Sequence, residues 1–145
     1  MKIKIQKLRE NAVMPVYQST MAAGADLCAA IEEPITLEPM GRVLVPTGIA
    51  AQPEREDCVL LIAARSGLAV KKGVTLSNGI GVVDADYRGE ICVGLVNLGP
   101  ETVTISAGER IAQLLIMPII KGEFEETDSL SETQRGSGGF GSTGK

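Results

Sequence analysis

The chain has 145 residues, a formal charge of −4 and a pI of about 4.9, which argues against a protein that coats the phosphates of long nucleic acids. It is long enough for one domain, whose core must be aliphatic because only 3% of the residues are aromatic. The absence of histidine excludes Ser-His-Asp and Cys-His catalysis and the usual zinc sites. The remaining carboxylates, arginines, hydroxyls and amides suit a magnesium-dependent reaction on a phosphate.

The sequence shows no sign of export or of a membrane span. No basic leader with an apolar stretch opens it, and the longest apolar run, IAQLLIMPII, is interrupted by Gln113 and Pro118. The cysteines are widely spaced and form no CxxC pair; they are Cys28, Cys58 and Cys92. We therefore expect a cytoplasmic protein with buried free thiols and no membrane partner.

Short β-branched segments separated by Gly, Pro, Asn and Asp fill the chain as far as Met117. The segments of strand length are KIKIQ (2–6), RVLVP (42–46), CVLLIAA (58–64), EICVGLVNL (90–98), TVTI (102–105) and RIAQLLIM (110–117). Only SGLAV (66–70) suggests a turn of helix. Many short strands at close spacing predict an all-β fold, an antiparallel sandwich or barrel.

The composition changes after Pro118. Residues 121–134 are charged and without periodicity, and a glycine-rich tail, RGSGGFGSTGK, runs from Arg135 to Lys145. We expect one β domain over 1–120, followed over 121–145 by a flexible connector and a C-terminal arm. The tail contains Phe140, one of only two phenylalanines in the chain, which raises the question of what it packs against.

The segment SNGIGVVDADYRGE (77–90) predicts a strand, a turn and a second strand. Asn78-Gly79 could be the apex of a hairpin, but the apolar IGVV run leading into DADY favours the second turn. Gly79 and Gly81 have no side chains, so a flat ligand could lie close to the main-chain amides and carbonyls there. Asp84 and the charges beside it are equally well explained as solvated turn residues.

The segment ARSGLA (64–69) leaves an apolar run and enters the possible helical turn. Arg65, Ser66 and the backbone amide of Gly67 could converge on a phosphate, because a helix start favours anions. An arginine and a serine after a strand are common, so a purely structural role is equally open.

The segment GERIAQLLI (108–116) places an amide in an aliphatic strand. Strand alternation puts Ile111, Gln113 and Leu115 on one side. Burying the Gln113 amide without a partner would cost about 1–3 kcal/mol, so we expect it to find one. The partner could be structural, or it could be a phosphate and an attacking water.

Five segments resemble, in order and over nearly the whole chain, the five motifs of the trimeric dUTPase family. They are AGADLCAA (23–30), ARSGLA (64–69), GVVDADYRGE (81–90), GERIAQLLI (108–116) and RGSGGFGSTG (135–144). The resemblance implies a distorted jelly-roll β barrel and a homotrimer with exchanged C-terminal arms, each active site using all three subunits. It also implies Mg²⁺-dependent hydrolysis of dUTP to dUMP and pyrophosphate by attack of water at the α-phosphate, which supplies dUMP for dTTP synthesis and keeps uracil out of DNA.

The resemblance also assigns the chemistry. Asp84 matches the general base, and Asp26 matches a carboxylate that reaches Mg²⁺ through water while the substrate phosphates hold most of the metal. The positions that match phosphate-binding residues are Arg65, Ser66, Gly67 and Gln113, of which Arg65 and Gln113 are also expected to take part in catalysis.

Recognition of the nucleoside is assigned in the same way. Uracil is expected to be read mainly by backbone groups, with Asn78, Val82 and Val83 taking part, while Tyr87 resembles an aromatic residue that packs on deoxyribose and excludes a 2′-hydroxyl. Cys92 is expected near the same wall. In the arm, Phe140 would stack on uracil, and the residues expected to close over the γ-phosphate are Arg135, Ser142 and Thr143. Gly141 is also expected to bind the substrate.

Two departures from the family pattern affect packing rather than chemistry: Ala25 replaces a residue that is commonly bulky, and Ala64 replaces a common proline.

Two other functions stay open. One is a dCTP deaminase, with or without dUTPase activity, which would release ammonia from dCTP. The other is a non-catalytic nucleotide-binding jelly-roll protein. The presence of four expected site residues argues against it: Arg65, Asp84, Gln113 and Arg135.

Overall fold

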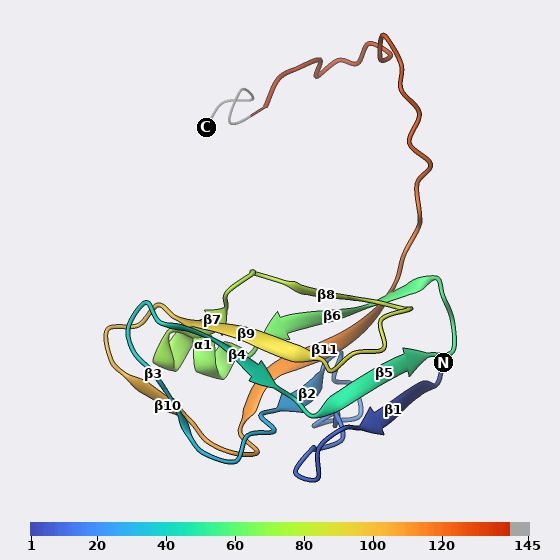
Figure 1. Cartoon of the computed structure of the whole chain (residues 1–145). Coiled ribbons are helices and arrows are strands. Elements are labelled where there is room, and N and C mark those ends of the chain that lie inside the picture. The colour runs from blue at the N-terminus through green and yellow to red at the C-terminus, as the bar shows by residue number, and fades with distance from the viewer. Residues whose placement is uncertain (140–145) are drawn as a thin grey trace.

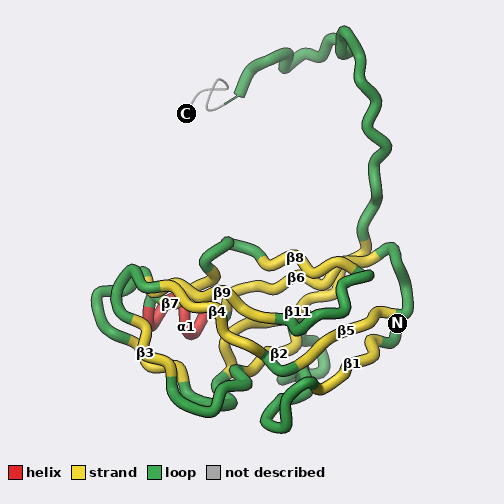
Figure 2. Tube along the Cα trace, viewed as in Figure 1, coloured by secondary structure: helices red, strands yellow, loops and turns green. Residues whose placement is uncertain are grey.

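The computed structural model describes residues 1–139, and they form a β structure with one short helix (Figures 1 and 2). The strands are β1 (Ile3–Lys7), β2 (Ala25–Cys28), β3 (Ile35–Leu37), β4 (Arg42–Pro46), β5 (Ile49–Pro53), β6 (Cys58–Ala64), β7 (Val74–Leu76), β8 (Gly81–Asp84), β9 (Cys92–Asn97), β10 (Val103–Ile105) and β11 (Arg110–Pro118), and the helix is α1 (Ser66–Lys72). The predictions of an all-β fold and of a helical turn at 66–70 are confirmed.

The strands pair in four antiparallel groups. A four-stranded sheet has the order β2-β11-β6-β8, and a three-stranded sheet has the order β4-β9-β7. The pairs β1-β5 and β10-β3 complete the structure. All four groups contribute to one core of Ala, Val, Leu and Ile side chains, as the low aromatic content requires. Cys28 and Cys58 are buried free thiols, and Cys92 is a half-buried one.

The predicted hairpin around Asp84 is wrong in its pairing. The strands on either side of the turn exist, but β8 pairs with β6, whereas β9 pairs with β4 and β7. The turn itself is closed by a hydrogen bond from the Tyr87 amide to the Asp84 carbonyl (3.1 Å). Gly81 explains the close approach of β8 to β6, because a Cβ there would lie 2.8 Å from the Ile62 Cβ. The 84–91 segment therefore crosses from one sheet to another.

After β11 the chain leaves the barrel. Residues 119–139 form no strand or helix, their side chains are largely exposed, and Figure 1 shows them running away from the sheets. One backbone hydrogen bond, from Ile119 to Asp57 (3.0 Å), ties the start of this segment to the barrel. Among the described residues, no helix has both the length and the apolar character needed to cross a membrane.

Candidate functional site

The buried carboxylate of Asp26 connects three of the candidate segments. Asp26 is only 3% exposed, and its Oδ1 accepts hydrogen bonds from Arg65 Nε (3.1 Å) and Gln113 Nε2 (3.5 Å). Its Oδ2 accepts one from Arg110 Nη1 (3.1 Å). The strand register brings these side chains together. Gln113 on β11 pairs with Asp26 on β2 on one side and with Ala63 on β6 on the other, and Ala63 precedes Arg65 by two residues.

Gln113 does not share a side of its strand with Ile111, so that prediction is wrong. The pairing of β11 with β2 shifts register between Arg110 and Ala112, and a bulge breaks strand alternation at this point. Ile111 consequently joins Leu114 in the core, while Gln113 is half-buried and turned towards Asp26.

The start of α1 offers uncapped backbone donors. Arg65 is in an extended conformation at the N-cap, and no side chain caps the helix. Ser66 and Gly67 follow, and both are exposed. A Cβ on Gly67 would meet no atom of the subunit within 4 Å, so packing within the chain does not require glycine here. The close approach of a ligand or a second chain would explain it.

A hollow of about 300 Å³ lies beside the turn that carries Asp84. Its lining comes from β4, from β8 and the following turn, and from the start of β9; the lining residues are Leu44, Val82, Val83, Asp84, Tyr87, Glu90, Ile91 and Cys92. The hollow is at the small end of the range for ligand pockets. It unites five predicted site residues, whereas a larger hollow, about 730 Å³ beside the end of α1, contains none.

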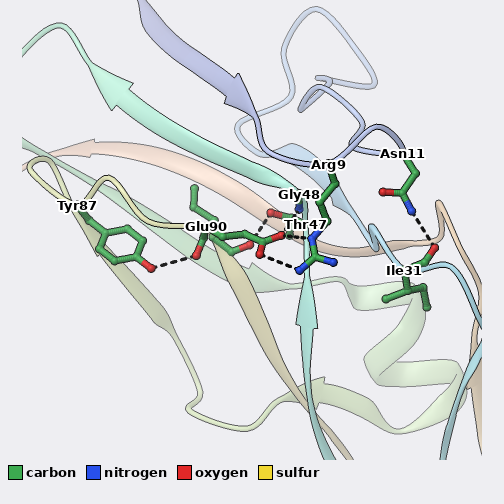
Figure 3. Close-up of polar contacts among 8 residues, drawn as sticks. Arg9, Asn11, Ile31, Thr47, Gly48, Tyr87 and Glu90 are labelled. Carbon is green, nitrogen blue, oxygen red and sulfur yellow. Dashed lines mark hydrogen bonds and ion pairs between the residues drawn. The ribbon is translucent and has the colours of Figure 1, made fainter.

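Glu90 is a residue of this hollow that the sequence did not single out. Its carboxylate accepts two hydrogen bonds from Arg9 and one from the Gly48 amide, and its carbonyl accepts one from Tyr87 Oη (Figure 3). The hydrogen bonds from Arg9 lower the pKa of Glu90. Burial raises the pKa of the Cys92 thiol, which keeps it protonated and unreactive at neutral pH.

The side chains around Asp26 and the hollow that contains Asp84 lie apart within one subunit. Gln113 faces Ala63 on β6, and Asp84 faces Val59, four residues away on the same strand. Four residues at about 3.3 Å each along β6, combined with the two strand spacings of about 4.8 Å from β11 to β8, put the Cα atoms of Asp84 and Gln113 roughly 16 Å apart. A single subunit therefore cannot place both side chains on one phosphorus atom and its attacking water.

Two further candidates, Asn78 and Arg135, are not brought to either group. Asn78 is an exposed turn residue before β8, and Arg135 donates a hydrogen bond only within the arm, to the Gly138 carbonyl (2.8 Å). The other arm residues of the prediction lie outside the described part of the chain; they are Phe140, Gly141, Ser142 and Thr143.

The described residues contain no cluster of three or more acidic or sulfur side chains that would form a metal cage by themselves. Asp26 supplies the oxygen chemistry that Mg²⁺ prefers, but both of its oxygens already accept N–H donors. This donor set fits a contact with the metal through water better than direct coordination.

Comparisons with known proteins agree on one family. A profile described as dUTPase matches residues 10–144. The chain is 54% identical to the deoxyuridine 5′-triphosphate nucleotidohydrolase of Wolinella succinogenes, over all of this chain and 95% of the relative. It is 50% identical to the enzyme of the same name from Hydrogenobaculum, over 99% of each chain.

Solved structures extend the likeness to three dimensions. A dUTPase variant from Staphylococcus bacteriophage 80alpha, determined with dUpNHpp, is 28% identical and has a TM-score of 0.88 over 99% of each chain. A dUTPase variant from phage phi11 of S. aureus, described with a structural Mg(II) ion, is 25% identical with a TM-score of 0.81, over 91% of this chain and 100% of the other.

Proposed function

This chain belongs to the dUTPase family and hydrolyses dUTP to dUMP; we propose that it does so at a site shared between the subunits of a trimer, with Asp84 as general base. The observation that carries the shared site is the separation of roughly 16 Å between Asp84 and Gln113, set by strand register. If one subunit supplies the group around Asp26 and a neighbour supplies the hollow around Asp84, the two groups can act on one substrate.

The surface of the single subunit supports association. Large apolar side chains are exposed over several elements of the barrel: Leu44, Val70, Ile80, Val82, Leu98 and Met117. A contiguous apolar patch, such as the one to which Leu44 and Val82 contribute at the hollow, is typical of a surface that is buried against a partner. Leu44 and Val82 also line the hollow, so covering them would at the same time enclose the nucleoside.

Recognition of uracil is assigned to the outer edge of β8. This strand is the last in its sheet, and an edge strand presents backbone N–H and C=O groups that no neighbouring strand uses. Successive residues of an antiparallel strand turn their N–H and C=O groups to opposite edges, so one of Val82 and Val83 faces β6 and the other faces outward. Uracil pairs with the outward groups, and cytosine would place donors against donors. Tyr87 lines the same hollow, where it packs on the deoxyribose.

The chemical step follows from these positions. The exposed Asp84 carboxylate takes a proton from a water molecule, the water oxygen forms a bond to the α-phosphorus, and the bond from this phosphorus to the bridging oxygen breaks to release pyrophosphate. Arg65, Gln113 and the amides at the start of α1 hold the phosphates. A placed general base contributes about 10²- to 10⁴-fold to the rate.

The phosphates of the substrate would hold Mg²⁺ in the site. When bound, Mg²⁺ neutralises charge on the phosphate oxygens. Asp26 would contact it through water, and the pairs with Arg65 and Arg110 fix the orientation of that carboxylate. The arm of a third subunit, through Arg135 and Phe140, closes over the site. We place the enzyme in the cytoplasm, where its substrate is formed.

Two measurements test this function. Purified protein with dUTP and Mg²⁺ should release pyrophosphate, and with dCTP it should release no ammonia, which separates the enzyme from a deaminase and from a non-catalytic binding protein. Sedimentation should give the mass of three chains. A monomer that cleaves dUTP at full rate would refute the shared site but leave the activity intact.

A further inference from the structure

Glu90 is the point where three distant segments meet. Its Oε1 accepts hydrogen bonds from Arg9 Nε (2.7 Å) and the Gly48 amide (2.9 Å), and its Oε2 accepts one from Arg9 Nη2 (3.0 Å), as Figure 3 shows. Arg9 follows β1, and Gly48 lies between β4 and β5. Three donors around one carboxylate fix its orientation as well as its position.

The backbone at Gly48 is closely packed. Its φ is 71°, and a Cβ at this position would lie 2.7 Å from the Ala12 Cβ and 2.9 Å from the Ala30 Cβ. Its carbonyl accepts a hydrogen bond from the Leu8 amide (2.7 Å). Glu90 is therefore held against a closely packed part of the barrel, which has no room to follow a movement of the 84–90 turn.

The Tyr87 ring depends on the backbone that Glu90 anchors. Its Oη donates to the Glu90 carbonyl (3.1 Å), and a Cβ on Gly89 would lie 2.6 Å from the ring atom Cζ, so the ring lies directly against this backbone. Tyr87 and Glu90 line the same hollow as Asp84. A shift of the 89–90 backbone would move the ring and with it the wall of the hollow.

We propose that the Arg9–Glu90 pair positions Tyr87 and thereby sets how strictly the site requires a deoxyribose, an inference that rests on the function proposed for the hollow around Asp84. Arg9 is a positioning residue, since it does not line the hollow itself. The Arg9 side chain is 46% exposed, and exposed pairs contribute little to stability. The main effect of the pair is therefore expected in selectivity, and its effect on the stability of the fold should be small.

The kinetic test compares R9A with R55A. Arg55 forms a similar two-bond pair with Asp57. It lines neither the hollow around Asp84 nor the cluster of side chains around Asp26, so it is a matched control for the loss of one guanidinium and one ion pair. We expect R9A to reduce the ratio of kcat/KM for dUTP over UTP by about 5- to 10-fold, while kcat for dUTP changes by less than about 3-fold. R55A should leave both the dUTP/UTP ratio of kcat/KM and the kcat for dUTP unchanged. R9K keeps the charge but not the two-bond geometry, so its ratio should lie between those of R9A and the wild type.

A second measurement needs no activity. The chain has two tyrosines and no tryptophan, so in a Y17F background Tyr87 is the single intrinsic fluorophore. R9A and E90A should increase acrylamide quenching of Tyr87 and lower its anisotropy, and R55A should change neither.

The outcomes distinguish a failure of the positioning role of Arg9 from a failure of the proposed function. Unchanged Tyr87 fluorescence together with an unchanged dUTP/UTP ratio in R9A would overturn the positioning role. A wild-type protein that leaves dUTP intact would refute the proposed function, and the fluorescence comparison would still decide whether Arg9 holds Tyr87. A lower unfolding midpoint in R9A with unchanged selectivity would show that the pair is only structural.

Discussion

Asp26 and Gln113 stand opposite each other in the β2–β11 pair, with the Gln113 amide 3.5 Å from the Asp26 carboxylate. Arg65 and Arg110 reach the same carboxylate at 3.1 Å. One buried acid thus organises side chains that the sequence places far apart. The group expected to hold phosphates is consequently pre-arranged before any ligand arrives.

Replacing this acid should destabilise the fold. In D26N the new amide N–H₂ faces guanidinium donors, and we expect the free energy of unfolding to fall by about 1–3 kcal/mol. The partly exposed arginines keep the loss below that of a fully buried pair. Urea titration at one fixed protein concentration measures the change, because association adds to stability.

The control for D26N is D57N, which removes the partner of an exposed arginine. Its unfolding midpoint should stay close to that of the wild type. Equal midpoints for D26N and D57N would contradict the organising role of Asp26.

The general-base assignment predicts a selective loss of turnover. D84N should bind a non-hydrolysable dUTP analogue about as well as the wild type, while kcat falls by at least about 10²-fold. Calorimetry and a pyrophosphate assay measure the two quantities. Asp86 is an exposed carboxylate on the same turn, so D86N serves as the control and should keep turnover. A D84N enzyme of normal rate would remove Asp84 from the mechanism.

Removal of residues 135–145 should slow hydrolysis without melting the barrel. The described hydrogen bonds of residues 135–139 stay within the arm or reach Thr133 in the connector, so removing the arm breaks no described hydrogen bond to the barrel. We expect an unchanged thermal midpoint for the ligand-free truncated protein and a lower kcat/KM. A large drop in the midpoint would mean that the arm supports folding, and F140A then tests the aromatic contact alone.

Asn97 should be important for stability although it lies outside both candidate groups. It is 0% exposed, its Nδ2 donates to the carbonyls of Leu37 (2.9 Å) and Glu101 (2.7 Å), and its Oδ1 accepts from the Gly99 amide (2.9 Å). N97A leaves these groups unpaired and should cost about 2–4 kcal/mol. N11A, which removes one hydrogen bond of an exposed asparagine, should cost much less in the same denaturant titration.

The lowered pKa of Glu90 predicts a stability change with pH. A carboxylate with a folded pKa below its unfolded value stabilises the protein fully above the unfolded pKa, near 4.5. This contribution is lost as the pH falls through the folded pKa. The wild type should therefore be more stable than E90Q at pH 7, and the difference should shrink below pH 4.5 in thermal melts. A constant difference across this range would contradict the ionised pair.

The sequence predicted strands best where the pattern was local. CVLLIAA and RIAQLLIM are long apolar runs, and each became a strand of the four-stranded sheet. Strand β2 was missed because all four of its residues are buried, which removes the alternation that marks a strand. Pairing is non-local, so nothing between 77 and 90 revealed that β8 and β9 belong to different sheets.

The candidate site was predictable in its residues but not in its connections. The motifs supplied Asp26, Asp84 and Gln113, whereas Arg110 and Glu90 were not singled out. Both lie inside segments that the motifs covered, but their partners lie 84 and 81 residues away in the sequence. Only the packing of the sheets shows which acid faces which guanidinium.

The extended segment after β11 has a consequence for the encounter between arm and site. Nineteen residues, 121–139, can span about 60 Å at full extension, while a barrel of this size is only about 35 Å across. In the proposed trimer, such a tether would keep its end near neighbouring sites at an effective concentration of the order of millimolar. Because the entropy of a flexible tether varies slowly with its length, adding or removing a few residues here should alter closure far less than changing a single side chain at its tip.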